Sequence, residues 1–269
     1  MLIMNDSRPL GIFDSGLGGL TVVAAVRKLL PWENIVYLGD TARVPYGNRS
    51  PETIRLFAQQ DIDFLLKKNV KAVIAACNTV SANALDRTDF PVPVCGVIEP
   101  GADAASAIPG AKRIVVLGTR ATVRSDAYKK ALLARDPALT VDQRFCPLFV
   151  PLVEEGLLEG NVVQSVFDLY LQDLQNDPPD AVLLGCTHYP LLKKALQQYL
   201  PESVTVVDSA DAAALAVQSL LKQLDLAAPA EQKNGDLQIF ATDIAGGFSE
   251  QAARFLGTEC PVPRIGTLF

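Results

Sequence analysis

The sequence has few of the residues that build disulfide frameworks or metal centres. Its 269 residues include five cysteines and one histidine. The cysteines are odd in number, widely spaced and without a CxxC pair, so we expect neither a disulfide framework nor a structural zinc site. Free thiols in a reducing cytoplasm fit this pattern better.

Long apolar runs and runs of basic residues are also absent. No stretch approaches the roughly 18 apolar residues of a membrane span, and residues 1–9 lack the basic and apolar regions of a secretion signal. The net charge is −6, and no Lys/Arg-rich run occurs, which argues against nucleic acid as a partner. We therefore expect a cytoplasmic protein that binds neither membrane nor nucleic acid.

Common cofactors are excluded by missing motifs. The glycine-rich turn after the apolar run 10–13 has the character of an anion-binding turn. However, residues 16–21 (GLGGLT) lack the last glycine of the GxGxxG dinucleotide pattern, and no P-loop lysine follows. A pyridoxal enzyme needs a Schiff-base lysine and a phosphate cup, and neither cysteine-bearing strand described below ends in a lysine. We expect no cofactor and no metal.

What the sequence does contain is a regular alternation of strand-like and helix-like segments. Hydrophobic residues make up 49% of the chain and charged residues 20%, enough for a substantial core in one large or two ordinary domains. Apolar runs such as 70–76 and 181–184 are typical of buried parallel strands. The alternation predicts an α/β fold with two halves and mainly parallel sheets. We also expect a break at 99–101, irregular chain at 147–151, and a closing helix at 248–256.

Two cysteines follow such strands. Cys77 comes after the run 70–76 and Cys186 after 181–185, and in each case polar residues and a helix start follow. Buried cysteine usually acts as a small hydrophobe, but the polar neighbours and the repetition favour a site. Open α/β sheets bind ligands at the carboxyl ends of their strands. About 110 residues separate the two cysteines, roughly one small domain, so we expect the thiols to face each other from two similar halves.

Several motifs taken together resemble the glutamate racemase family, cofactor-independent enzymes of bacterial peptidoglycan synthesis. They cover most of the chain in the family's order: GIFDSGLGG at 11–19, YLGD at 37–40, PYG at 45–47, ACNT at 76–79, GT at 118–119 with TV at 122–123, and GCTHYPL at 185–191. The resemblance implies two pseudo-symmetric α/β domains with the active site in the cleft between them. The first, discontinuous domain would comprise 1–98 plus 210–269 and the second 99–209, and the protein would form a homodimer.

The resemblance also implies an activity and a set of site residues. The enzyme would be an isomerase that interconverts L- and D-glutamate and supplies D-glutamate for cell-wall biogenesis and cell shape. Cys77 and Cys186 would be the two acid–base thiols, assisted by Asp14, His188 and, from the segment 150–154, Glu154. The positions that would contact substrate are Asp14, Ser15, Tyr46, Gly47, Asn78, Thr79, Thr187 and His188.

Two thiols suit this chemistry because racemisation removes a proton from one face of Cα and delivers one to the other. One thiol must be ionised while the other is neutral, and a free cysteine has a pKa of about 8.5, so neighbouring groups have to help. A carboxylate beside a thiolate raises the thiol's pKa, so we expect Asp14 to accept the thiol's proton or to contact the substrate ammonium. By analogy, Cys77 would act on the proton of D-glutamate and Cys186 on that of L-glutamate.

The residue patterns alone leave other interpretations open. Asp14 has the spacing of a helix N-cap, a lone histidine such as His188 is more often structural than catalytic, and Glu154 has the position of a solvated charge at a helix start. An aspartate or hydantoin racemase would share both thiols. A non-catalytic binding module would need neither, and a thiol-redox enzyme would join them in a disulfide.

Overall fold

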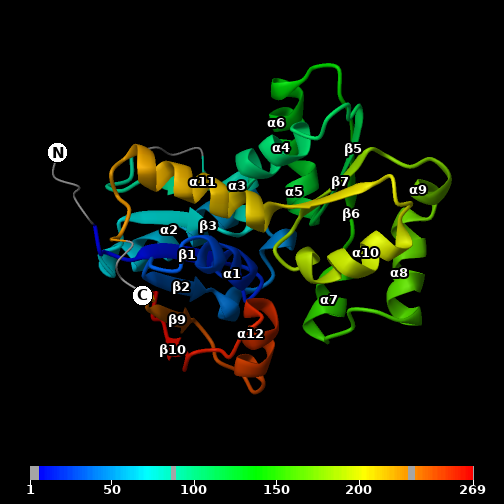
Figure 1. Ribbon diagram of the computed structural model, residues 1–269. Coiled ribbons are helices and arrows are strands. Elements are labelled where there is room, and N and C mark those ends of the chain that lie inside the picture. Colours follow the sequence, from blue (N-terminus) through cyan, green and yellow to red (C-terminus); the bar gives the residue numbers. More distant parts are fainter. Residues whose placement is uncertain (1–5, 86–88, 230–233, 269) are drawn as a thin grey trace.

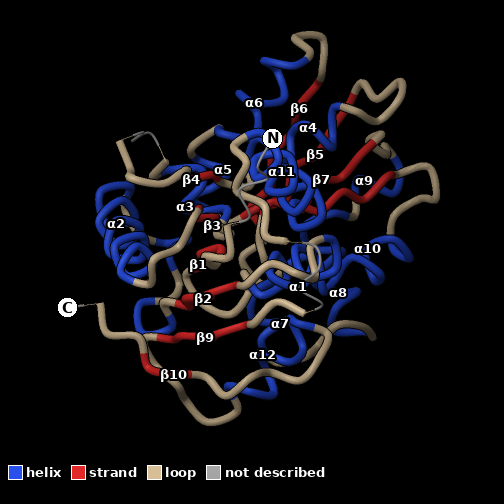
Figure 2. Tube along the Cα trace, turned by 60° about the vertical axis from the view of Figure 1, so that its left-hand side comes forward, coloured by secondary structure: helices blue, strands red, loops and turns tan. Residues whose placement is uncertain are grey.

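The computed structural model describes residues 6–85, 89–229 and 234–268 (Figure 1). Within these ranges the strands form two parallel sheets, which lie side by side in Figures 1 and 2. The first sheet has the order β10-β9-β2-β1-β3-β4 and the second β6-β5-β7-β8. The strands are β1 (Leu10–Asp14), β2 (Ile35–Gly39), β3 (Ala72–Ala75), β4 (Val94–Cys95), β5 (Arg113–Gly118), β6 (Thr140–Phe145), β7 (Ala181–Gly185), β8 (Thr205–Asp208), β9 (Leu237–Ala241) and β10 (Arg264–Ile265).

The two sheets repeat one strand order. The arrangement β2-β1-β3-β4 in the first sheet recurs as β6-β5-β7-β8 in the second, and all of these pairs are parallel. In each sheet the direction of winding reverses between two central strands, β1 and β3 or β5 and β7. Ligands of open α/β sheets bind at the carboxyl ends beside such a reversal. The predicted α/β fold with two similar parallel halves is confirmed.

Helices cover both faces of each sheet. On the first sheet, α1, α11 and α12 share an apolar core with one face and α2 with the other. On the second, α7, α8 and α10 cover one face and α4 and α6 the other. The helices are α1 (Leu20–Leu29), α2 (Pro51–Lys67), α3 (Asn78–Asn83), α4 (Ile98–Ser106), α5 (Arg120–Arg124), α6 (Ala127–Arg135), α7 (Phe149–Glu154), α8 (Asn161–Leu171), α9 (Asp173–Asn176), α10 (Lys193–Tyr199), α11 (Ser209–Gln223) and α12 (Phe248–Leu256). Short 3-10 turns are η1 (Thr41–Arg43), η2 (Tyr46–Asn48) and η3 (Tyr189–Leu192).

The central strands are apolar throughout because both of their faces are buried. All five residues of β1 are buried; Leu10 and Ile12 join the core beneath α1 and α11, whereas Phe13 joins the core beneath α2. In β5, Val115 and Val116 likewise enter different cores. This two-sided burial produces the continuous hydrophobic runs that mark parallel strands in the sequence.

The chain returns to the first sheet after the second is complete. α11 packs against both α1 and α4, and so lies over the junction of the two halves (Figure 1). β9 then pairs with β2, from Ile35 opposite Leu237 to Gly39 opposite Ala241. On this basis we propose 1–98 plus 210–269 as one domain and 99–209 as the other.

The structure corrects three local predictions. Residues 99–101 do not break the chain but lie inside α4, and α7 occupies most of the segment expected to be irregular. Pro100 and Pro151 each lie in the first turn of their helix, where a backbone N–H has no intrahelical partner to lose. β10 also follows α12, so the closing helix is not the last element. None of the helices in the described ranges is long and apolar enough to cross a bilayer.

Candidate active site

A cavity of about 260 Å³ lies between the carboxyl ends of the two sheets, and both candidate thiols line it. The cavity is lined on one side by residues of the first sheet and its loops, and on the other by residues that follow β5 and β7. It brings together all but one of the predicted site residues: Ser15, Tyr46, Gly47, Cys77, Asn78, Thr79, Glu154, Cys186, Thr187 and His188. Asp14 is the exception, because it is fully buried behind the cavity wall.

Strand register places the two thiols at equivalent points of the two sheets. Ala75 in β3 pairs with Phe13 in β1, and Cys77 comes two residues later, at the N-cap of α3. Gly185 in β7 pairs with Gly118 in β5, and Cys186 follows at once. Each sulfur therefore lies just beyond a central strand, where the chain leaves the sheet.

The surroundings of Cys77 keep its thiol neutral. The residue is 5% exposed, and its Sγ lies 3.7 Å from the Ser15 hydroxyl oxygen. Burial, with a further contribution from the Asp14 carboxylate, raises the pKa of Cys77 to about 12. Such a group holds its proton at neutral pH unless a base removes it.

Asp14 links the first turn to the opposite half of the molecule. One carboxylate oxygen accepts a hydrogen bond from the Gly16 backbone N–H at 3.1 Å, and the other from the Thr187 hydroxyl at 3.4 Å. The N-cap of α1 is Gly19, so the interpretation of Asp14 as that cap is wrong. Its contact with substrate and its role in proton transfer stay predictions.

The group beside Cys186 is basic, the His188 imidazole, whereas the charged group near Cys77 is the Asp14 carboxylate. His188 is 6% exposed; its Nε2 lies 3.3 Å from a carboxylate oxygen of Glu154, and the ring of Phe255 packs edge-on at 5.1 Å between ring centroids. Burial opposes protonation of the imidazole, but hydrogen bonds to Cys186 and Glu154 outweigh it and raise the pKa of His188 to about 10. At neutral pH the second sulfur therefore has an imidazolium as its neighbour.

The raised pKa of His188 predicts a pH-dependent stability. The folded chain holds this proton up to about pH 10, whereas an unfolded histidine releases it near pH 6.5. The stabilisation is complete below pH 6.5 and is lost as pH rises towards 10. We expect the free energy of unfolding to fall between pH 6.5 and 8.5, with a slope approaching about 1.4 kcal/mol per pH unit. The sequence has no other histidine, so His188→Asn should remove most of the pH dependence of the urea-denaturation midpoint across this range. An unchanged dependence of the midpoint on pH would contradict the protonated state of His188.

Hydroxyl and amide groups from both halves meet at the cavity wall. The Thr79 hydroxyl lies 3.0 Å from that of Thr119, and the Asn78 carboxamide oxygen accepts a 2.6 Å hydrogen bond from Tyr128. Thr119 and Arg120 line the cavity but were not among the predicted site residues. A signal for them existed, because Thr119 and Arg120 follow β5 as Ser15 and Gly16 follow β1.

Tyr46 lines the cavity, but its hydroxyl is already hydrogen-bonded within the first half. The Tyr46 hydroxyl donates to the buried carboxylates of Asp40 and Asp61, and Arg43 pairs with both acids. Burial and the two carboxylates raise the pKa of Tyr46, so its proton stays in place. A Cβ at Gly47 would lie 2.9 Å from the Thr119 Cβ, so this close approach of the two halves requires glycine.

Helix α12 holds the Glu154 segment against the first half. The Arg254 guanidinium donates to the backbone carbonyls of Val153 and Glu154 at 3.2 and 3.1 Å, and the Gln251 carboxamide also donates to the Glu154 carbonyl. Arg254→Ala should let the end of α7 shift, and with it the contact between Glu154 and His188. If Glu154 and His188 have the roles that the sequence predicts, we expect about a tenfold loss of kcat/KM for glutamate racemisation, since small displacements of catalytic groups are costly. Arg264→Ala, at an exposed edge position, is the control; equal activity in both variants would show that α12 does not position the site.

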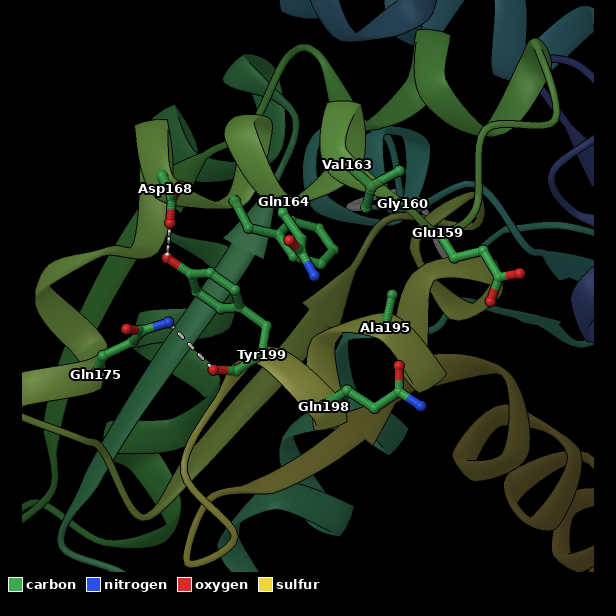
Figure 3. Close-up of a pocket in the computed structure, with 10 residues that line it drawn as sticks. Glu159, Gly160, Val163, Gln164, Asp168, Gln175, Ala195, Gln198 and Tyr199 are labelled. Carbon is green, nitrogen blue, oxygen red and sulfur yellow. Dashed lines mark hydrogen bonds between the residues drawn. The ribbon is translucent and has the colours of Figure 1, made fainter.

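A separate hollow on the second half lacks the thiols that line the active-site cavity. It measures about 370 Å³ and lies between α8 and α10, and no cysteine lines it (Figure 3). Three of its polar residues are paired with one another: the Tyr199 hydroxyl donates to Asp168 at 2.7 Å, and Gln175 donates to the Tyr199 carbonyl at 3.3 Å (Figure 3). Across the described parts of the chain, no group of three or more histidine, cysteine or acidic residues is placed to hold a metal ion.

Known proteins resemble this chain over nearly its whole length. Residues 21–217 match the family model described as Asp/Glu/Hydantoin racemase. The glutamate racemase of Geobacter metallireducens is 44% identical over 252 residues, which is 93% of each protein. The crystal structure of the Francisella tularensis glutamate racemase in complex with D-glutamate has a TM-score of 0.89 at 37% identity, covering 98% of both chains. The Thermus thermophilus enzyme in complex with β-chloro-D-alanine has a TM-score of 0.87 at 42% identity, covering 97% of both.

Proposed function

The chain belongs to the Asp/Glu/Hydantoin racemase family, and from this premise we propose that it interconverts L- and D-glutamate with Cys77 and Cys186 as its two bases. The observation that carries the proposal is that both thiols line one cavity, each at the end of a central strand of a different sheet. That placement suits proton exchange on opposite faces of a bound amino acid. The relatives at 44% identity support glutamate as the substrate.

The neutral Cys77 thiol and the His188 imidazolium suit the L-to-D direction. Acting as the base, Cys186 takes the Cα proton of L-glutamate, and its S–H bond forms as the Cα–H bond breaks. Cys77 then gives its proton to the opposite face of the carbanion and is left as thiolate. In the reverse direction Cys77 abstracts and Cys186 donates. No redox step occurs, and each turnover moves one proton on and one proton off the substrate.

The neighbours of the thiols have different tasks in this scheme. His188, backed by Glu154, keeps a positive charge beside Cys186 and exchanges its proton when that thiol is neutral. Asp14 lies behind the first thiol, where it receives the Cys77 proton when Cys77 has to act as base. The hydroxyl and amide groups of Ser15, Asn78, Thr79 and Thr187, with backbone N–H groups at the helix starts, hold the substrate carboxylates.

Substrate choice separates this proposal from its nearest rival. A chiral assay of both enantiomers of glutamate and of aspartate should show racemisation of glutamate and little of aspartate. Equal rates on aspartate would contradict the glutamate assignment. A binding module would tolerate loss of both thiols, and a thiol-redox enzyme would form a Cys77–Cys186 disulfide under mild oxidation. All five cysteines are free thiols in the structure.

The wider role follows from the reaction. We propose a cytoplasmic homodimer that supplies D-glutamate for peptidoglycan synthesis without a cofactor. Expression in a bacterium that requires external D-glutamate should restore growth on medium without it. Failure to restore growth by an enzyme that is active in vitro would contradict this role.

A further inference from the structure

A groove lined by three arginines adjoins the active-site cavity. It measures about 460 Å³ and lies between the 47–51 loop, which leads into α2, and the side of α5. Arg49, Arg120 and Arg124 line it, and all three are exposed. Gly47, Asn48 and Arg120 also line the active-site cavity, so the groove and the cavity are neighbours that share a wall.

Among the residues that the structure describes, no carboxylate lines this groove and none of its three arginines forms an ion pair. Other arginines, such as Arg113 and Arg144, are paired with aspartates. The chain as a whole carries a net charge of −6. Three unpaired guanidiniums therefore give this groove a positive charge on a protein that is negative overall.

Neighbouring residues fix the direction of one of these arginine side chains, Arg120. The Arg120 guanidinium lies over the Phe145 ring, 4.5 Å from its centroid, which directs the side chain without neutralising it. The first turn of α2, a helix of 17 residues, also borders the groove at Ser50 and Pro51. The acids nearest in sequence do not line the groove: Glu52 hydrogen-bonds the α2 backbone and Ser50, and Asp126 accepts a 2.6 Å hydrogen bond from the Gln143 carboxamide.

We propose that this groove binds a polyanion with adjacent phosphate or carboxylate groups, and that the bound polyanion restricts access to the active-site cavity. Guanidinium forks pair bidentately with either kind of group, and an anion would relieve the mutual repulsion of the three arginines. The groove is larger than the neighbouring cavity, about 460 against 260 Å³, which favours a ligand larger than a single amino acid. The binding is independent of the proposed function, and only its kinetic consequence depends on racemisation.

Binding is tested by titration calorimetry on the full chain, with pyrophosphate and citrate as the phosphate and carboxylate probes. We expect saturable binding of one probe per chain, weakened at least tenfold in the Arg49→Gln/Arg124→Gln double variant. The control is Arg27→Gln/Arg264→Gln, which removes the same charge at exposed positions outside the groove. Equal weakening in both double variants, or no saturable binding of either probe, would overturn the proposal. The stronger probe identifies the preferred kind of anion.

Kinetics test the effect on access. In the unmodified enzyme the stronger probe should raise the KM for both glutamate enantiomers several-fold without changing kcat. The Arg49→Gln/Arg124→Gln variant should keep its basal kcat and lose this effect. An unchanged KM in the presence of bound probe would overturn the access claim. A variant that alters the sedimentation of the protein would show that the groove is a subunit interface instead. Binding of a probe to a protein without racemase activity would contradict the proposed function but would still support anion binding in the groove.

Discussion

Replacing either Cys77 or Cys186 with serine is expected to lower racemisation of both glutamate enantiomers by about 10³-fold or more. A hydroxyl ionises far less readily than a thiol, and acid–base catalysis by a positioned group contributes about 10²–10⁴-fold. In the proposed mechanism one thiol takes the proton and the other delivers it, so each single variant should lose both directions. The measurement is kcat/KM from a chiral assay of each enantiomer.

The matched control for this pair is Cys260→Ser, a half-buried cysteine that does not line the cavity. It should keep full activity, and thermal unfolding should show that all three variants fold. If either active-site variant kept more than about a tenth of the wild-type rate, that thiol would not be a base of the reaction.

The same variants separate the roles of the two thiols. Elimination from a glutamate analogue with a leaving group at Cβ needs proton removal from Cα but no delivery to the other face. Cys77→Ser should therefore lose elimination from the D-analogue and keep it from the L-analogue, and Cys186→Ser should do the reverse. The opposite pattern would reverse the assignment of thiols to enantiomers.

The second large effect is expected for Gly18→Ala. A Cβ at this position would lie 2.4 Å from the Thr187 hydroxyl oxygen and 2.5 Å from Nδ1 of His188, both of which belong to the opposite half. The new methyl group would displace the imidazole from Cys186 and Glu154. We expect a loss of about 100-fold in kcat/KM, in line with the cost of a 1 Å misplacement. Overpacking at the junction should also lower the free energy of unfolding by about 1–3 kcal/mol.

Gly246→Ala is the control for Gly18→Ala. Nothing lies within 4 Å of a Cβ at Gly246, so the substitution should change neither activity nor stability measurably. If the imidazole moves as expected, Gly18→Ala should also weaken the pH dependence of stability assigned to His188. A Gly18→Ala enzyme with normal kcat/KM would show that the junction relaxes without disturbing the histidine.

Local patterns in the sequence predicted the strands better than the short helices. β1, β5 and β7 are buried on both faces, so their continuous apolar runs mark them without knowledge of their neighbours. α4 and α7 were missed because Pro100 and Pro151 look like breaks until their place in a first helical turn is known. β10 is two exposed residues long and has no apolar pattern to detect.

The candidate site, too, was predicted only in part from local sequence patterns. The motifs located both thiols and most of the cavity wall, because each motif lies at one strand end. What they could not predict is how the halves meet: the hydrogen bonds from Tyr128 to Asn78 and from Thr187 to Asp14 join residues far apart in the chain. The 3.0 Å approach of the Thr79 and Thr119 hydroxyls also depends on this meeting, so only the structure shows it.

The most direct test of the two-thiol mechanism is the reaction run in D₂O from one pure enantiomer and stopped at low conversion. Each thiol exchanges its proton with solvent, so the thiol that protonates the far face delivers deuterium. The product enantiomer should carry one deuterium at Cα while the remaining substrate carries none, starting from either enantiomer. Product that keeps the substrate's original proton would contradict this, because it would show one base carrying that proton from face to face.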